Sequence, residues 1–307
     1  MRIVFMGTPE FAVPCLRILA GGGDEVAAVF SQPDRPKGRG YKTVPTPVKA
    51  AALEYSIPVC QPGTLRDGEA QGLLSDYAPE VIVVVAYGRI LPPSILGLPK
   101  YGCVNLHASL LPKFRGASPV QSAVLAGEYR TGVTAMLMNE GMDTGDILET
   151  RETPIDKDET AIELAERLSL MGAEMIIPVL RGLSGGSIIP KKQEEALAIY
   201  APMLKKEMGR VDWSRPALDI HNQIRGLQPW PAAYTSVSGK TLKLWRSRVL
   251  DDAGGLPGEI LRAGERMIVS AGQGAIELLE VQLEGSKRMP AAAMLRGLRI
   301  REGDFLG

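Results

Sequence analysis

Short apolar runs alternate with helical patterns along the first half of the chain. The apolar runs predict buried strands at residues 2–6, 25–30, 57–60, 81–85 and 102–107. The stretches between them predict helices near residues 8–21, 47–55 and 67–77, with another after Pro119. Unbroken runs such as VIVVV at 81–85 suit strands that are covered on both faces. We therefore expect an α/β domain with a doubly wound, mostly parallel, Rossmann-like sheet.

The pattern changes after Gly132. Residues 133–138 and 147–150 read as strands that flank a polar turn at 140–146. Thr160 and Glu163 have the spacing of a capping box, and an apolar helical stripe follows at Leu164, Leu168, Met171, Met175 and Val179. A glycine-rich and then polar stretch comes next. We therefore place the first domain at residues 1–188 and a linker at 189–207.

The remainder of the chain, residues 208–307, has one short helical pattern at 217–227 and then strand-and-turn sequence. Glycine-punctuated runs with partial alternation lie at 240–250, 258–261, 267–271 and 275–283. Such short runs predict a second, smaller domain built as an OB-like β-barrel.

The composition is that of a globular protein without a metal or disulfide framework. The chain has 307 residues, with 35 Lys and Arg against 35 Asp and Glu, and the zero net charge argues against non-specific coating of nucleic acid. Cys15, Cys60 and Cys103 are far apart, and neither CxxC nor HExxH occurs, so we expect no zinc site. Because no signal-peptide pattern or membrane-length apolar run is present, we expect a cytoplasmic location.

The loop after the first strand disfavours two common ligands of Rossmann-like sheets. Ligands of open α/β sheets bind beyond the carboxyl ends of the strands. Residues 7–11 read GTPEF, which is not the GxGxxG of a dinucleotide site, and GxxxxGK[ST] occurs nowhere in the chain. Because a phosphate cradle of either type is missing, NAD and ATP chemistry are poor hypotheses.

Two polar residues stand at the end of the fifth predicted strand. Asn105 and His107 are two residues apart, so their side chains project to the same face. An Asn amide donates to a carbonyl oxygen, and a His donates to the same oxygen or passes a proton. The pair is therefore suited to polarise an acyl group for attack.

A carboxylate in the turn at 142–146, Asp143 or Asp146, could orient the His107 imidazole. Each residue also has a plainer interpretation. Asn105 could form a turn, His107 could be a satisfied core histidine, and the two aspartates could be ordinary turn residues. The pattern indicates an acyl or one-carbon transfer site, and it does not name a substrate.

The chain also resembles a known family. AYGRILP at 86–92, NLHASLLPKFRGASP at 105–119 and MDTGDIL at 142–148 are similar to the 10-formyltetrahydrofolate-dependent formyltransferases. Within that family, GTPEF at 7–11, SQPDRPKGRGYK at 31–42, TPVKAAA at 46–52, DWSRPA and QPWPAA resemble the members that act on methionyl-tRNA. The resemblance covers essentially the whole chain and implies the formyltransferase type of Rossmann-like fold.

For the catalytic step, the resemblance implies the set Asn105, His107 and Asp143. Asn105 would hold the formyl oxygen. His107, kept charged by Asp143, would stabilise the oxyanion and help to protonate the departing folate nitrogen. The implied donor is 10-formyltetrahydrofolate, and the nucleophile is the α-amine of methionyl initiator tRNA. No metal and no nucleotide cofactor are implied.

For binding, the resemblance implies a pterin pocket bordered by Val85, Ala86, Tyr87, Gly88, Ser109, Leu110, Leu111 and Pro112. Leu110 and Leu111 could equally be core residues. Phe11 is implied to border the pocket for the methionine side chain.

A basic loop occupies residues 34–49. Its charged residues, with Asp34 as the one acid, are Arg35, Lys37, Arg39, Lys42 and Lys49. Its prolines and glycines argue against a regular helix or strand before Pro47. Charged loops are usually solvated surface, but a loop this long often contacts a ligand. The resemblance makes it an insertion that reaches the acceptor end of the tRNA, with Arg39 and Lys42 as the contacts.

Basic residues also gather in the predicted second domain. From Lys240 onward there are eleven basic residues against nine acidic ones, and a cluster falls on one strand pattern at Lys240, Lys243, Arg246 and Arg248. Nucleic-acid binding and simple solvent exposure explain this cluster about equally well. For His221 we expect a packing role. We expect core or interdomain anchors, rather than platforms for base stacking, at Trp213, Trp230 and Trp245.

Three other activities stay open at this point. They are formyl transfer to a small amine such as an amino-nucleotide or amino-sugar, RNA binding without catalysis, and deformylating hydrolysis. The basic loop and the second domain count against a small substrate. The complete set of Asn105, His107 and Asp143 counts against a non-catalytic relative. We expect a monomer with no obligate protein partner.

Overall fold

The computed structural model describes residues 1–37, 42–251 and 254–307 and forms two compact units. The first unit consists of Met1–Gly116, Thr131–Thr153 and Ala165–Tyr200. The second consists of Ala117–Arg130, Pro154–Leu164 and Ala201–Gly307. The second unit thus takes in two stretches that the sequence analysis placed in the first domain.

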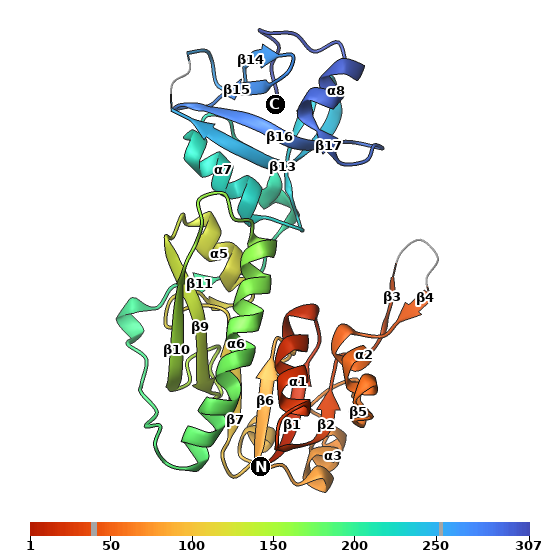
Figure 1. Cartoon of the computed structure of the whole chain (residues 1–307), viewed down its shortest axis with the longest axis vertical. Coiled ribbons are helices and arrows are strands. Elements are labelled where there is room, and N and C mark those ends of the chain that lie inside the picture. The colour runs from red at the N-terminus through yellow and green to blue at the C-terminus, as the bar shows by residue number, and fades with distance from the viewer. Residues whose placement is uncertain (38–41, 252–253) are drawn as a thin grey trace. The chain divides into compact units, whose positions relative to one another are not determined.

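A seven-stranded sheet forms the centre of the first unit, in the order β10-β9-β7-β6-β1-β2-β5 (Figure 1). Its strands are β1 (Arg2–Gly7), β2 (Glu25–Phe30), β5 (Val59–Cys60), β6 (Val81–Val85), β7 (Cys103–His107), β9 (Arg130–Leu137) and β10 (Ile147–Pro154). The pairs β1–β2, β1–β6, β2–β5 and β6–β7 are parallel, and β7–β9 is antiparallel. The predicted mostly parallel sheet is therefore confirmed.

The helices of the first unit cover both faces of this sheet. They are η1 (Glu10–Ala12), α1 (Val13–Ala20), α2 (Pro47–Glu54), α3 (Glu69–Tyr77), α4 (Pro93–Leu96), α6 (Ala161–Ser184) and η2 (Glu195–Leu197). On one face, Val4, Met6 and Val84 share a core with Leu74 of α3 and Ile95 of α4. The sequence pattern did not predict α4.

Helix α6 lies close against the antiparallel edge of the sheet. A Cβ atom at Gly172 would lie 3.3 Å from the Val133 side chain and 3.5 Å from that of Leu106.

The capping box predicted at Thr160 and Glu163 is confirmed. The Thr160 backbone N–H donates to Glu163 Oε2 at 2.8 Å, and the Glu163 N–H donates to Thr160 Oγ1 at 3.3 Å.

The basic loop contains a short hairpin that the sequence analysis did not expect. Strand β3 (Arg35–Lys37) pairs antiparallel with β4 (Lys42–Val44). Proline is tolerated where the strand has no sheet partner on its other side, which is the case for Pro36 in a two-stranded ribbon. The expectation of no strand before Pro47 is therefore wrong. Arg39 lies outside the described residues.

The second unit contains an antiparallel sheet in the order β12-β13-β16-β15-β14, with β17 also paired to β16. Its strands are β12 (Ala233–Val237), β13 (Lys240–Leu250), β14 (Ile260–Ala263), β15 (Met267–Ser270), β16 (Ala275–Leu283) and β17 (Met289–Pro290). Its helices are α5 (Pro119–Leu125), η3 (Lys206–Gly209), α7 (Ala217–Gly226) and α8 (Ala291–Gly297). The pattern missed β12 and α8. Two-residue strands β8 (Arg115–Gly116) and β11 (Tyr200–Ala201) complete the elements.

The core of the second unit is apolar and closes over one face of this sheet. Leu242 and Leu244 of β13, Ile276 of β16 and Ile220 and Ile224 of α7 are all fully buried in it. Trp213 is also buried there, as expected, whereas Trp230 is 55% exposed and does not act as a core anchor. Among the described residues, no helix has the length and apolar character needed to cross a membrane.

Candidate active site

The site is built on the carboxyl end of β7. Asn105 pairs in register with Val84 of β6, and His107 stands two residues further on, opposite Thr134 of β9. Both side chains are largely buried, with exposed fractions of 9% for Asn105 and 6% for His107. The predicted placement of the two residues, at the end of a central strand, is therefore observed.

Both ring nitrogens of His107 face acceptors. Nε2 lies 2.9 Å from the Phe114 carbonyl oxygen, and Nδ1 lies 3.6 Å from Asp143 Oδ2. A carbonyl oxygen only accepts, so Nε2 carries a proton. A carboxylate also only accepts, so a proton on Nδ1 makes the second contact favourable as well. The doubly protonated imidazolium is the form that suits both neighbours.

Asp143 is held in the turn between β9 and β10. Its Oδ2 accepts a hydrogen bond from the Gly116 backbone N–H at 2.9 Å, so the carboxylate is fixed between β8 and the His107 ring. Asp143 has φ of 53°, a left-handed conformation that Asp tolerates better than most residues. Of the two aspartates left open by the sequence, Asp143 is the one that contacts His107.

Asn105 supplies the unpaired polar group of the site. Within the part of the chain that the structure describes, its side-chain amide makes no hydrogen bond. Buried polar groups normally find a partner within the protein or in a ligand. The amide is therefore available to donate to an oxygen of a bound molecule, next to the His107 ring. This arrangement stabilises negative charge on an acyl oxygen.

A cleft of about 780 Å³ opens at the carboxyl ends of β1, β2 and β6, and β6 is the strand next to β7 in the sheet. We call it the β1–β6 cleft, and its lining includes Thr8, Gln32, Val44, Ala86, Tyr87 and Gly88. Thr8 Oγ1 and Gln32 Nε2 both donate to the Tyr87 carbonyl oxygen, at 3.0 and 3.2 Å. Three of the four residues expected between 85 and 88 thus line a cleft, while Val85 is buried in the strand.

The second expected pterin segment lies around a different opening. Leu111 and Pro112 line a cleft of about 360 Å³ together with residues 147–150 and 191–194. We call it the Gln193 cleft. Ser109 is fully buried, and its hydroxyl donates to the Lys113 carbonyl oxygen at 2.6 Å. Leu110 is half-buried. The structure therefore does not bring residues 85–88 and 109–112 into one cleft.

The other residues expected to contact a substrate include Phe11 and Lys42, which lie on different elements of the first unit. Phe11 lies in η1, and its carbonyl oxygen accepts from Ser169 Oγ at 2.6 Å, but Phe11 does not line the β1–β6 cleft. Lys42 lies in strand β4. At the base of the hairpin, Lys49 holds the pKa of Asp34 below its ordinary value through an ion pair at 2.5 Å.

Sequence reasoning missed three contributors to the site. The His107–Asp143 pair is held by the Phe114 carbonyl, just before β8, and by the Gly116 N–H in β8. Gln193 donates to the backbone of the turn that carries Asp143. Phe114 and Gly116 lie inside the motif at 105–119, which could have drawn attention to them. Gln193 lies in a segment without a periodic pattern, so nothing in the sequence pointed to its contact with the active site.

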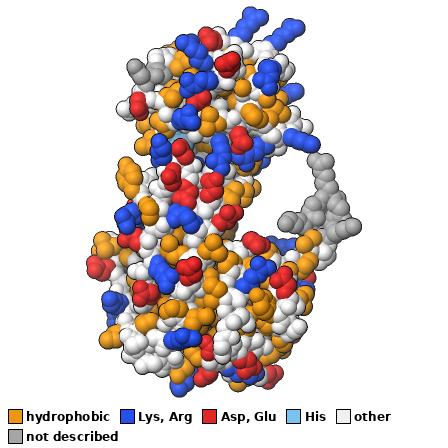
Figure 2. All heavy atoms as spheres, in the orientation of Figure 1, with side chains coloured by type: hydrophobic (Ala, Val, Ile, Leu, Met, Phe, Trp, Pro, Cys, Tyr) orange, Lys and Arg blue, Asp and Glu red, His pale blue; other side chains and the backbone are white. Residues whose placement is uncertain are grey.

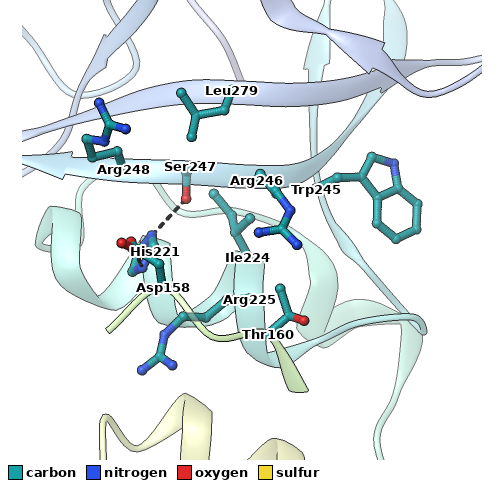
Figure 3. A pocket seen from close by; sticks show the side chains of 10 residues that line it. All are labelled: Asp158, Thr160, His221, Ile224, Arg225, Trp245, Arg246, Ser247, Arg248 and Leu279. Carbon is teal, nitrogen blue, oxygen red and sulfur yellow. Dashed lines mark hydrogen bonds and ion pairs between the residues drawn. The ribbon is translucent and has the colours of Figure 1, made fainter. Parts of the chain in front are cut away.

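A pocket of about 210 Å³ in the second unit is lined by polar residues that include His221 (Figure 3). His221 is buried, and its Nδ1 lies 2.9 Å from Ser247 Oγ while Nε2 lies 2.9 Å from the Lys157 carbonyl oxygen. Burial holds the pKa of His221 below its ordinary value. With both nitrogens satisfied in the neutral form, the expected packing role of His221 is confirmed.

The basic cluster on β13 divides into paired and unpaired cations. Arg246 forms an ion pair with Glu163 at 2.5 Å, and Arg248 lies 3.6 Å from Glu277. Lys240 and Lys243 are exposed and make no ion pair with any other residue that the structure describes. Across the described ranges, no group of three His, Cys, Asp or Glu side chains could hold a metal ion.

Comparison with known families follows the two units of the chain. Residues 1–180 match the formyl transferase family, and residues 203–299 match the family described as formyl transferase, C-terminal domain. A methionyl-tRNA formyltransferase of Geobacter sulfurreducens is 53% identical over 308 residues, which cover 100% of this chain and 97% of the relative.

Solved structures share the fold. An N-formyltransferase from Helicobacter canadensis, in complex with folinic acid and dTDP-3-aminofucose, matches with a TM-score of 0.68 and 19% identity. The match covers 94% of this chain and 99% of that one. A methionyl-tRNA formyltransferase from Clostridium thermocellum matches with a TM-score of 0.56 and 19% identity, over 81% of this chain and 93% of its own.

Proposed function

The chain belongs to the formyl transferase family, and we propose that it transfers the formyl group of 10-formyltetrahydrofolate to the α-amine of methionyl initiator tRNA. The observation that carries this proposal is the full-length identity of 53% to a methionyl-tRNA formyltransferase. The unpaired Asn105 amide beside the His107–Asp143 pair adds a site with the required chemistry.

Asn105 and His107 stabilise the transition state of attack on the formyl carbon. As the amine nitrogen attacks, the formyl oxygen gains negative charge. The Asn105 amide donates a hydrogen bond to this oxygen, and the His107 imidazolium supplies a positive charge next to it. Groups of this kind act in the transition state rather than in the bound ground state.

His107 also moves the proton that the reaction requires. The bond between the formyl carbon and folate N10 breaks, so N10 gains a proton, while the attacking amine loses one. Nδ1 makes the looser of the two contacts of the ring, at 3.6 Å from Asp143, compared with 2.9 Å for Nε2. We assign the Nδ1 proton to transfer to N10, after which the imidazole takes up the proton from the amine.

The nucleophile needs no strong base in this scheme. A free α-amino group has a pKa of about 7.7–8.0, and the ester to tRNA lowers it further. A useful fraction of the amine is therefore neutral near pH 7. Asp143 acts through its charge and its position 3.6 Å from His107 Nδ1.

The folate is assigned to the strand ends around Asn105. Ala86, Tyr87 and Gly88 offer backbone groups along the β1–β6 cleft, which is large enough for a drug-sized ligand. We also propose that the pterin ring is supported by Val85, Ser109, Leu110, Leu111 and Pro112. The pocket for the methionine side chain is bordered by Phe11 in this proposal. Peptide groups at these positions match the polar edge of a pterin.

The tRNA is assigned to cations of each unit. In the basic loop, Asp34 is neutralised by Lys49, so the charges of Arg35, Arg39 and Lys42 have no acid of the loop to offset them. In the second unit, Lys240 and Lys243 are exposed, and Figure 2 shows Lys and Arg side chains, drawn in blue, on the surface of this unit. Phosphate contacts from such side chains give affinity that depends on salt.

The proposed setting follows from the reaction. A formylated initiator serves translation initiation in a bacterial cytoplasm, and we propose that the protein works there. We also propose that it acts as a monomer without an obligate protein partner, because all three members of the catalytic set come from one unit of one chain.

A transfer assay tests the proposal directly. The protein is incubated with 10-formyltetrahydrofolate and, in parallel, with methionyl-tRNA, free methionine and a small amino-sugar nucleotide. We expect formyl only on methionyl-tRNA. Formyl on the amino-sugar alone would keep the chemistry and overturn the tRNA substrate. Binding of tRNA without any transfer would overturn the catalytic assignment.

A further inference from the structure

The segment expected to be a linker packs in part on the active-site turn. Lys191 forms an antiparallel bridge with Ile147 of β10, with N–H···O distances of 2.8 and 2.9 Å. Two residues later, the Gln193 side chain reaches the turn between β9 and β10. The residues involved all belong to the first unit.

Gln193 clamps the backbone on both sides of Thr144. Its Nε2 donates to the Asp143 carbonyl oxygen at 2.9 Å and to the Gly145 carbonyl oxygen at 2.7 Å. Both amide hydrogens are thereby used on the turn that carries the catalytic carboxylate. Asp143 has a left-handed φ of 53°, and such a conformation persists where its surroundings hold it in place.

The other end of the Gln193 amide is fixed by a buried guanidinium. Gln193 Oε1 accepts from Arg115 Nε at 3.0 Å, and Arg115 is only 1% exposed. Arg115 Nη1 also contacts both carboxylate oxygens of Glu195 at 2.9 Å, but that carboxylate is 72% exposed. Gln193 is therefore the less exposed of the two side chains that hold Arg115.

Arg115, the first residue of β8, stands between the two residues whose backbone groups contact the catalytic pair. Phe114 precedes it and accepts from His107, and Gly116 follows it and donates to Asp143. One amide thus ties together the two backbone segments that set the distance between His107 and Asp143. A glutamine is suited to this because it offers two donors and an acceptor without a charge.

We propose that Gln193 is a positioning residue for formyl transfer, which acts by holding the Asp143 carboxylate against the His107 ring. This inference rests on the proposed function. Gln193 does not touch the reacting atoms, so its removal changes kcat and leaves the KM values of both substrates nearly unchanged. Its effect passes through Asp143, so it disappears once the carboxylate is gone.

A double-mutant cycle of Gln193 with Asp143 tests the proposal. Gln193→Met keeps the length of the side chain and removes all three hydrogen bonds. We expect kcat to fall by about 10–100-fold, with KM changes below threefold. In the Asp143→Asn background, the same change should cost less than threefold, because residues that act as a unit are not additive. Gln71→Met is the matched control, because Gln71 lies on α3 and its side chain makes no hydrogen bond with the residues that the structure describes.

Two outcomes overturn the proposal. One is a kcat for Gln193→Met within threefold of the wild-type value. The other is a loss that is the same size with and without the Asp143 carboxylate, since Gln193 would then support the fold in general. Thermal unfolding of each variant shows whether the fold is intact.

A second readout does not depend on formyl transfer. The chain has two histidines, so NMR of the histidine ring nitrogens gives signals from His107 and His221 alone. In Gln193→Met the His107 signals should move, while those of His221 stay in place as an internal reference. Unmoved His107 signals would overturn the positioning role. If the wild-type protein failed to formylate methionyl-tRNA, the NMR experiment would still test whether Gln193 positions the His107–Asp143 pair, independently of the proposed function.

Discussion

Replacing Asp143 with asparagine removes one charge from the active site and preserves the size of the side chain. The asparagine Oδ1 can still accept from the Gly116 N–H, which Asp143 Oδ2 now contacts at 2.9 Å. The shape of the turn is therefore kept. What is lost is the attraction between the carboxylate and the His107 imidazolium.

The size of this loss follows from the geometry. Asp143 Oδ2 and His107 Nδ1 are 3.6 Å apart, for which Coulomb's law at an effective dielectric constant of about 20 gives about 4.6 kcal/mol. The Asp143 side chain is 18% exposed, so solvent screens part of this energy. We expect kcat to fall by about 10²–10³, which corresponds to about 2.7–4 kcal/mol.

The assay is single-turnover formyl transfer to methionyl-tRNA at saturating donor. Asp146→Asn provides a matched control in the same turn. The Asp146 backbone carbonyl accepts a hydrogen bond from the Leu137 N–H at 2.9 Å, and this bond does not depend on the side chain. Its rate should stay within twofold of the wild type. A loss below tenfold for Asp143→Asn, with the fold intact, would refute the charge-based role of this residue.

Three further predictions follow from the site and the second unit. Asn105→Ala should lower kcat by about 10²–10³ without lowering the melting temperature, since its amide has no partner among the described residues; normal turnover would contradict its role. Burial lowers the pKa of His221, so the unfolded chain binds its proton more readily and stability falls as the pH drops below about 6.5. Urea unfolding between pH 5 and 8 should show that the free energy of unfolding falls less at low pH in His221→Gln than in the wild type. An equal fall in both proteins would contradict this prediction. Arg39→Ala combined with Lys42→Ala should raise KM for tRNA and weaken the salt dependence of that KM. Kinetics identical to the wild type would contradict a role of the basic loop in tRNA binding.

The central strands of the first unit could be predicted because they are almost entirely buried. VIVVV at 81–85 has no polar position, and every residue of β6 is buried in the structure. The same reasoning failed for the hairpin β3–β4, because its prolines exclude a central strand but not a two-stranded ribbon. Helix α4 was missed because four residues between prolines and glycine are too few to show a helical period.

Aromatic residues were harder to interpret than aliphatic ones. Trp213 is buried and donates from Nε1 to Thr235 Oγ1 at 3.2 Å, as a core tryptophan should. Trp230 is largely exposed, and Trp245 is half-buried with the Arg288 guanidinium 5.1 Å from its ring centre. A tryptophan has an apolar body and a polar edge, so its sequence position alone does not decide between these environments.

The catalytic set was predictable in its members but not in its support. Asn105 and His107 could be paired because alternation along a strand is a local rule, and Asp143 came from the family motif. Gln193 and Arg115 are 78 residues apart, and only the folded chain brings their side chains together. Their contact links the segment that follows α6 to β8, and the Nε2 group of the same Gln193 side chain holds the turn that carries Asp143. A segment without periodic pattern can therefore set the geometry of an active site, if one of its side chains satisfies backbone groups that the turn leaves unpaired.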